Sequence, residues 1–180
     1  MIRIFPILFI LILSNLFFAQ SKKKLIRNNI TSIQTEKITD SGRQIVNIKK
    51  FNKKGELILE EDYDKNGKWK SKDEWIYDKN GNIIEKTEYK ENNEIKAKEI
   101  YQYKNDFLIQ ITYFKEKEIE KIEQYAYNAF GEKIEEKIFN KKNDLIEKII
   151  YEYDKHGLKI KRITYNALNE ILEQRIYTYQ

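Results

Sequence analysis

The stretch Tyr77-Asp78-Lys79-Asn80-Gly81-Asn82-Ile83 decides the fold of this chain. An Asp followed two residues later by Asn, and then by Gly, favours a type I turn that ends in a left-handed residue. Asp78 can accept hydrogen bonds from the backbone two residues on, and Gly81 can adopt a positive φ without a Cβ clash. We therefore expect a hairpin in which Asp78 pairs with Asn82 and Tyr77 lies opposite Ile83.

The same arrangement recurs along the chain. An aromatic anchor is followed four residues later by Gly or Asn, the two residues that enter the left-handed region most easily. The anchors and their turn residues are Phe51 and Gly55, Tyr63 and Gly67, Tyr77 and Gly81, Tyr89 and Asn93, Tyr127 and Gly131, Phe139 and Asn143, Tyr153 and Gly157, and Tyr165 and Asn169. The turns after Tyr103 and Tyr113 depart from this pattern, and the first of them is two residues shorter. Anchor spacings of 12 and 14 alternate, so the repeat is a 26-residue pair of hairpins.

These repeats predict an all-β fold: a single coiled antiparallel meander of about twelve strands, open or barrel-like. The first strands are expected at residues 30–38 and 44–51, around a turn at residues 40–42, and no helix is expected. Odd positions from residue 57 on are rich in aromatic and aliphatic residues, whereas even positions are mostly charged. Because successive side chains of a strand alternate between its faces, we expect one aromatic face and one charged face.

The segments Tyr63-Asp64-Lys65-Asn66-Gly67, Tyr77-Asp78-Lys79-Asn80-Gly81 and Tyr153-Asp154-Lys155-His156-Gly157 resemble the YD repeats of the bacterial Rhs family. The resemblance covers most of residues 51–180. In that family such repeats form a spiralling β-sheet shell in secreted and cell-surface proteins. They have been associated with carbohydrate binding and with enclosing toxin domains. The resemblance thus implies a β-sheet repeat protein of the bacterial envelope or its surroundings.

The beginning of the chain indicates export. Residues 1–19 combine a basic residue, an apolar run and a small residue before a polar start, as a secretory signal peptide does. We expect a periplasmic, cell-surface or extracellular protein with three parts: the signal peptide (1–19), a basic segment with the first strands (20–50) and the YD-like hairpin repeats (51–180). The run Lys22-Lys23-Lys24-Leu25-Ile26-Arg27 is either a solvated mature N-terminus or a contact for an acidic polymer or lipid head groups.

Little in the sequence points to catalysis. The 29 carboxylates fall mostly at turns and on the polar face, Ser is scarce, and there is a single His and no Cys. His156 occupies the turn position that Asn66 and Asn80 hold in sister repeats, so we interpret it as a turn residue. The segment from Asp78 to Gly81 lacks the later acidic ligands of a calcium loop. We therefore predict a non-enzymatic protein without catalytic residues, metal or cofactor.

The aromatic residues are the one feature with binding character, because Tyr and Trp rings stack on sugars and carry a polar tip. The candidate ligand-binding residues are Trp69, Trp75, Tyr77, Tyr101, Tyr103, Tyr125, Tyr127, Tyr151 and Tyr153. Two interpretations stay open: this row binds a polysaccharide or a surface protein, or it is the core of the curled sheet. Nucleic acid is disfavoured, since residues 55–180 are net acidic and the chain is expected to be exported.

An alternative function uses the end of the sheet. The chain reaches residues 177–180 where a further turn would begin, so its last strand is expected to be an exposed edge. This chain would then be a structural or assembly module that pairs with a protein partner, or edge to edge with a second copy.

Overall fold

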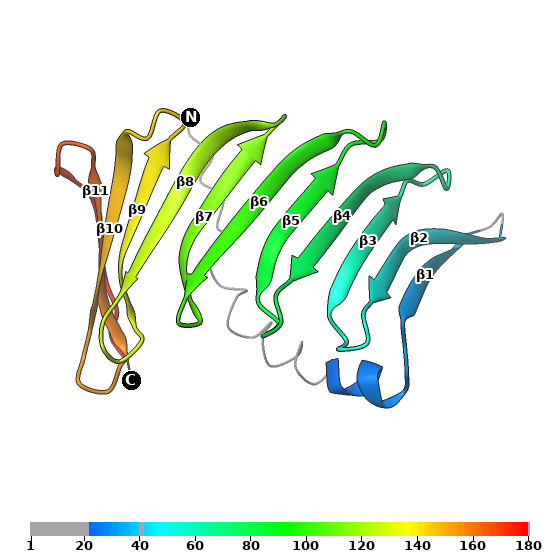
Figure 1. Cartoon of the computed structure of the whole chain (residues 1–180), viewed down its shortest axis with the longest axis horizontal. Helices are drawn as coiled ribbons and strands as arrows, with labels where there is room; N and C mark the ends of the chain where they lie inside the picture. The colour runs from blue at the N-terminus through cyan, green and yellow to red at the C-terminus, as the bar shows by residue number, and fades with distance from the viewer. Residues whose placement is uncertain (1–21, 40–41, 180) are drawn as a thin grey trace. The chain divides into compact units, whose positions relative to one another are not determined.

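A computed structural model describes residues 22–39 and 42–179 (Figure 1). The predicted signal peptide therefore lies outside the described residues. The strands are β1 (Ser32–Thr39), β2 (Gly42–Phe51), β3 (Leu57–Tyr63), β4 (Trp69–Tyr77), β5 (Ile83–Tyr89), β6 (Ile95–Lys104), β7 (Phe107–Lys115), β8 (Glu118–Tyr127), β9 (Lys133–Asn140), β10 (Leu145–Tyr153), β11 (Lys159–Asn166) and β12 (Ile171–Ile176). They form one antiparallel meander whose order follows the chain, and the sheet is not closed. The predicted all-β meander is confirmed, in its open form.

The hairpin turns have the predicted geometry. The eight turn residues expected in the left-handed region all have a positive φ, between 62° and 88°. In the turn that follows β4, the Gly81 N–H donates to the Asp78 carbonyl at 3.2 Å, and the Asp78 N–H donates to the Asn82 carbonyl at 2.9 Å. The Asp78 side chain also accepts from the Asn80 N–H at 2.8 Å. The pairing of Asp78 with Asn82 is therefore confirmed, and short polar side chains stabilise the turn from within.

Two turns are shorter: the turn after Tyr103, as the sequence indicated, and the turn after Tyr113, whose shortness was not predicted. Lys104 lies opposite Phe107 across Asn105 and Asp106, whose φ values are 50° and 64°. The β7–β8 hairpin turns in the same way through Glu116 and Lys117, at 50° and 76°. Two central residues with positive φ define a type I′ turn, whose twist matches that of the flanking strands.

The chain divides into two compact units, residues 1–75 and 76–180. The first unit contains a hydrophobic cluster of Leu25, Phe51 and Leu57, against which Trp75 packs. Leu25 belongs to a short helix at residues 22–27, where no helix was expected. Burial of Leu25 explains this difference, because an apolar side chain is removed from water only if its segment folds back onto the sheet. In the structure the basic run is thus part of this helix.

The second unit contains β5 to β12 in consecutive order. Within it the strands turn progressively: in Figure 1, β5 to β7 are seen face on and β9 to β11 nearly edge on. Each hairpin with a five-residue turn carries a bulge next to its anchor, as at Ala126/Tyr127 and Glu152/Tyr153. Bulges of this kind increase local twist and bend the strand.

Candidate functional site

The structure distributes the predicted ligand-binding residues over both units. Trp69 and Trp75 belong to the first unit, where Trp69 lies opposite Tyr63 and Trp75 packs against the hydrophobic cluster. The remaining seven residues belong to the second unit: Tyr77, Tyr101, Tyr103, Tyr125, Tyr127, Tyr151 and Tyr153. The hydroxyl groups of five of them, Tyr101, Tyr125, Tyr127, Tyr151 and Tyr153, follow two distinct bonding patterns.

One class of tyrosine binds the main chain of the preceding hairpin. The hydroxyls of Tyr127 and Tyr153 donate to the carbonyls of Leu108, at 2.9 Å, and Lys133, at 2.8 Å. Tyr179, a further 26 residues on, donates to the Lys159 carbonyl at 2.7 Å. Each of these bonds joins two residues that lie 19 or 20 positions apart in the sequence. They satisfy carbonyl groups at strand ends, so this class supports the fold.

The other class of tyrosine binds carboxylates. The Tyr101 hydroxyl donates to Glu99. Tyr125 donates to Glu123 Oε2 at 2.5 Å. Tyr151 donates to Glu136 Oε2 at 3.0 Å. We call the surface built from these pairs the tyrosine face; its residues are Glu99, Tyr101, Tyr113, Lys121, Glu123, Tyr125, Lys133, Glu136, Tyr151, Lys159 and Arg162.

Several members of the tyrosine face were missed by the sequence analysis. Tyr113 donates to Glu123 Oε2 at 2.9 Å, and Lys121 Nζ donates to Oε1 of the same carboxylate at 2.7 Å. Glu123 is only 9% exposed, so this shared carboxylate is a buried junction of three donors. A signal was available, because Glu99 and Glu123 each stand two residues before a tyrosine and hence on the same face of the strand.

Lysine side chains cover the tyrosine rings. Lys133 Nζ lies 4.9 Å from the centre of the Tyr125 ring and 5.0 Å from that of Tyr151, and it donates to Glu136 at 2.7 Å. Lys159 Nζ lies 4.7 Å from the Tyr151 ring centre. These distances fall within the range of cation–π attraction.

The expectation of one aromatic and one charged face is therefore wrong in this unit. Carboxylates and ammonium groups stand among the tyrosines. Tyr125 lies opposite Glu136 because the bulge at Ala126/Tyr127 shifts the register, so an even position shares a face with an odd one. Counting odd and even positions along the chain therefore does not predict the face of a side chain beyond a bulge.

The protonation of the tyrosine face follows from its burial. Burial, together with the bonded carboxylate Glu123, raises the pKa of Tyr125 far above its ordinary value of 10.0. Burial also acts to raise the pKa of Glu123, but the hydrogen bonds from Lys121 and Tyr125 outweigh it, and the net pKa is lowered. At neutral pH the face thus presents neutral phenols around an ionised carboxylate.

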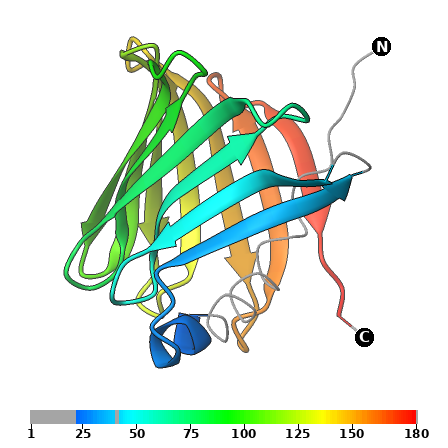
Figure 2. The same cartoon turned by 90° about the vertical axis from the view of Figure 1, so that its right-hand side faces the viewer.

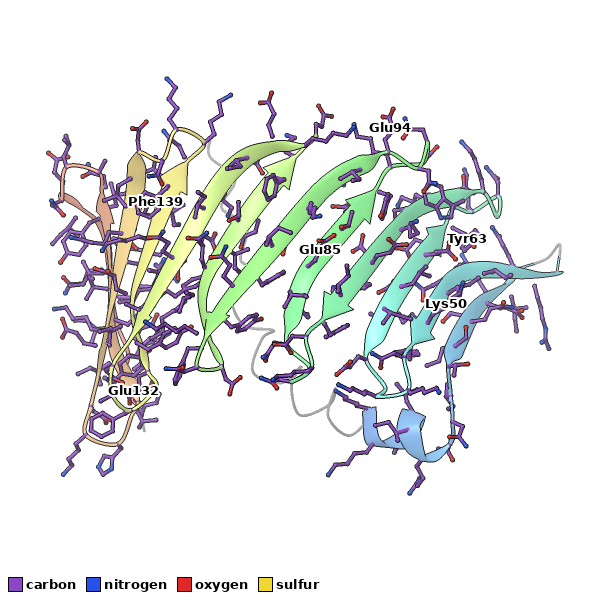
Figure 3. The ribbon with its side chains drawn as sticks, in the orientation of Figure 1. Lys50, Tyr63, Glu85, Glu94, Glu132 and Phe139 are labelled. Atoms are coloured by element: carbon purple, nitrogen blue, oxygen red, sulfur yellow. The ribbon has the colours of Figure 1, made fainter. Side chains whose placement is uncertain are left out.

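A groove of about 700 Å³ lies at the turn end of the tyrosine face, between the β8–β9 and β10–β11 turns. Its lining residues are Asn128, Phe130, Glu132, Ile134, Tyr151, Tyr153, Asp154, Lys155, His156 and Gly157. Phe130 is 89% exposed, which is unusual for a large apolar side chain. Glu132, labelled in Figure 3, accepts a hydrogen bond from Asn128 Nδ2 at 2.6 Å. The groove thus combines an exposed aromatic ring with amide, carboxylate and phenol groups.

His156 takes the turn position predicted for it, since its N–H donates to Asp154 Oδ1 at 2.8 Å. It also lines the groove, 26 residues after Phe130 at the equivalent place of the preceding repeat. Among residues 22–39 and 42–179, no group of three or more His, Asp or Glu side chains is arranged to hold a metal ion. In the same ranges no helix is long and apolar enough to cross a membrane.

Comparisons with known proteins give structural likenesses at low identity. Neither a protein-family model nor a curated protein matches the sequence, so the resemblance to YD repeats stays a prediction. A porin-like protein from Bacteroides uniformis is similar at 11% identity and a TM-score of 0.49, over 74% of this chain and 69% of that one. The TcdB2-TccC3-TEV structure is similar at 12% identity and a TM-score of 0.36, over 82% of this chain and 11% of that one.

A protein with unknown function from Bacteroides fragilis is similar at 15% identity and a TM-score of 0.30, over 84% of this chain and 96% of that one. None of these likenesses carries an inference about function, which rests on the chain's own residues.

Proposed function

We propose that this chain is an exported, non-enzymatic protein that binds a polysaccharide at the groove and the adjoining tyrosine face. The observation that supports this most directly is the exposed ring of Phe130 beside a groove of about 700 Å³. Ligand sites commonly enclose roughly 300–1,000 Å³ and combine apolar walls with a few polar groups. The groove has both properties.

The chemistry of the lining suits a sugar. An exposed aromatic ring offers a flat apolar surface to the C–H face of a pyranose. A carboxylate such as that of Glu132 can accept hydrogen bonds from sugar hydroxyls, and an amide such as that of Asn128 can both accept and donate them. The phenol of Tyr151, which also lines the groove, connects this region to the tyrosine face.

The charges near Tyr151 favour an acidic sugar. Burial, and then the nearby cations Lys133 and Arg162, lower the pKa of Lys159. Lys133 and Lys159 lie 5.0 and 4.7 Å from the centre of the Tyr151 ring. Together with Arg162 they outnumber Glu136, the carboxylate that bonds Tyr151, so positive charge is locally in excess. A uronate carboxylate would relieve this excess, so we expect acidic polysaccharides to bind more tightly than neutral ones.

Isothermal titration calorimetry with sodium alginate and with dextran tests this proposal. We expect saturable binding of alginate and weaker binding of dextran. Phe130→Ala should weaken alginate binding about tenfold, because stacking on an aromatic ring is lost. Leu168→Ala is the matched control: Leu168 is 77% exposed at the equivalent position of the β11–β12 turn, and it does not line the groove. Unchanged binding by Phe130→Ala, or absence of saturable heat with both polymers, contradicts the proposal.

Export rests on the sequence of residues 1–19. Mass spectrometry of the protein isolated from its bacterial host tests it. We expect a mature chain that starts close to residue 20 and is recovered outside the cytoplasm. An intact N-terminus on a cytoplasmic protein would refute export.

A further inference from the structure

The last strand of the sheet, β12, has an exposed outer edge. Strand β12 pairs with β11 and stands at the end of the strand order, as Figure 2 shows in red. Its apolar side chains are unusually accessible: Ile171 and Leu172 are each 59% exposed and Ile176 is 72% exposed. Exposed apolar edge strands are the places where sheets add a further strand.

The direction of the backbone groups along β12 follows from its pairing. The Tyr177 N–H donates to the Ile160 carbonyl at 3.0 Å, and the register continues through Arg175 opposite Arg162. In an antiparallel pair, hydrogen-bonded residues alternate with residues whose backbone groups point the other way. Residues 173, 175 and 177 therefore face β11, and residues 172, 174 and 176 direct their N–H and C=O groups outward.

We propose that two copies of this chain form a symmetric dimer by antiparallel pairing of β12 with β12, with Gln174 on the two-fold axis. In this register, the outward groups of residues 172, 174 and 176 meet the same groups of the second copy. Leu172 then lies opposite Ile176 of the second copy, and Glu173 lies opposite Arg175 of the second copy. The strand Leu172-Glu173-Gln174-Arg175-Ile176 is thus complementary to itself when reversed.

Charge selects this register over its neighbours. A two-fold axis at Arg175 would place two arginines opposite each other, and an axis at Glu173 would do the same with two carboxylates. Like charges directly opposite are destabilising, whereas opposite charges stabilise the pair. Within one chain Glu173 already accepts from Arg162 at 2.7 Å and from Arg175 at 2.8 Å. The dimer extends these contacts into one network of alternating charges.

The pairing of the two edge strands is irregular in different places. In the β1–β2 pair the extra residue is Val46 of β2, so β1 itself is not the bulged strand. In the β11–β12 pair the extra residue is Leu172, next to the turn, and β12 then pairs without interruption from Glu173 opposite Thr164 to Ile176 opposite Lys161. We place β12 rather than β1 at the interface because the charges of β12 are complementary to themselves when the strand is reversed.

Analytical ultracentrifugation with charge variants tests the dimer and its register. We expect the mature wild-type chain to be a concentration-dependent dimer. Arg175→Glu and Glu173→Arg should each weaken self-association at least tenfold, because like charges meet across the axis. An equimolar mixture of the two variants should form a heterodimer, since every cross-pair is then opposite in sign. A wild-type monomer at all concentrations, or a mixture that stays monomeric while both variants remain folded, overturns the proposal.

Cysteine crosslinking gives a second, independent measurement. Because the sequence contains no cysteine, any disulfide must form through the introduced residue. In the proposed register the two Gln174 Cα atoms are about 5.5 Å apart, within disulfide range. Gln174→Cys should therefore form a disulfide-linked dimer on mild oxidation. Leu172→Cys is the matched control, because the two Leu172 positions lie roughly 13 Å apart along the strands. Equal crosslinking of both variants, or crosslinking of the control alone, contradicts this register.

Discussion

The pair Phe51 and Leu57 in the first unit and the pair Tyr153 and Lys159 in the second occupy the same place in the repeat, on either side of a five-residue turn. The first pair is apolar, and it packs with Leu25 of the short helix. In the second pair, the Tyr153 hydroxyl bonds a main-chain carbonyl and the Lys159 ammonium lies beside the Tyr151 ring. One backbone unit thus supports a packed cluster in one region and a polar surface in the other.

The difference shows how a repeat protein separates folding from function. Turn residues determine the hairpin, and they are alike in both regions. In these two hairpins, the side chains at the anchor and six residues after it differ in the same way as the covering of the surface. Apolar residues at both places gain from being covered, whereas a lysine at the second place keeps a charge that is costly to bury.

The largest expected effect comes from removing the anchor of the packed region. Phe51→Ala should reduce the free energy of unfolding by about 3 kcal/mol, because a buried ring is lost and a cavity is left. Tyr153→Ala should cost less, since Tyr153 is only half-buried. Urea denaturation followed by circular dichroism measures both. An equal loss for the two variants would mean that the regions do not differ in packing.

Two turn glycines of the first unit, Gly55 and Gly67, test the contact between the helix and the sheet. A Cβ added to Gly55 would lie 3.1 Å from Ile26 Cγ1 and from the Lys22 carbonyl oxygen, whereas a Cβ on Gly67 would meet nothing within 4 Å. Both residues have a positive φ, so each Ala variant carries a strain of about 1–2 kcal/mol. Gly55→Ala should cost about 1 kcal/mol more than Gly67→Ala, because it displaces the helix. Equal melting temperatures for the two variants would contradict this packing.

A smaller effect is expected from the hydroxyl of a fold-supporting tyrosine. Tyr153→Phe removes the donor to the Lys133 carbonyl, at a cost of about 1 kcal/mol. Tyr165→Phe is the control, because the Tyr165 ring contacts Lys148 through its face, an interaction that phenylalanine retains. Thermal unfolding of both variants makes the comparison. If Tyr165→Phe lowers the stability as much as Tyr153→Phe does, the loss comes from removing any tyrosine hydroxyl and not from the bond to Lys133.

The smallest expected effect is that of pH on stability. Near neutral pH the tyrosine face does not change its protonation, and its contribution to stability is lost only in alkali. Burial, and then the nearby carboxylates Glu99, Glu123 and Glu136, raise the pKa of the four tyrosines of the tyrosine face: Tyr101, Tyr113, Tyr125 and Tyr151. A raised pKa in the folded state gives stability that is complete below the ordinary value of 10.0 and is lost as pH rises through the folded value.

Absorbance at 295 nm during an alkaline titration measures this resistance. We expect a first group of tyrosines to ionise near pH 10, and a second group to ionise only together with unfolding. Changing all four tyrosines of the tyrosine face to Phe should remove the second group. A single transition near pH 10 in the wild-type chain would show that the tyrosine face is hydrated throughout.

Much of the fold was accessible from the sequence, since turn chemistry is local. Residues within five positions of one another form the bonds of each hairpin turn, as Asp78, Gly81 and Asn82 do. The candidate site was foreseen only in part. Tyr101, Tyr125 and Tyr151 were selected as aromatic residues, but their carboxylate partners were not, and Phe130 and Glu132 of the groove were not selected at all.

The sequence by itself determined the hairpins, their number and their 26-residue period, because Gly and Asn at the fourth place after each anchor leave the backbone few alternatives. Only the tertiary structure decided which side chains share a face. The bulges beside the anchors bring Tyr125 opposite Glu136, and packing folds the basic residues 22–27 into a helix over Phe51 and Leu57. Register and burial depend on contacts between residues far apart in the chain, and a local pattern carries no information about them.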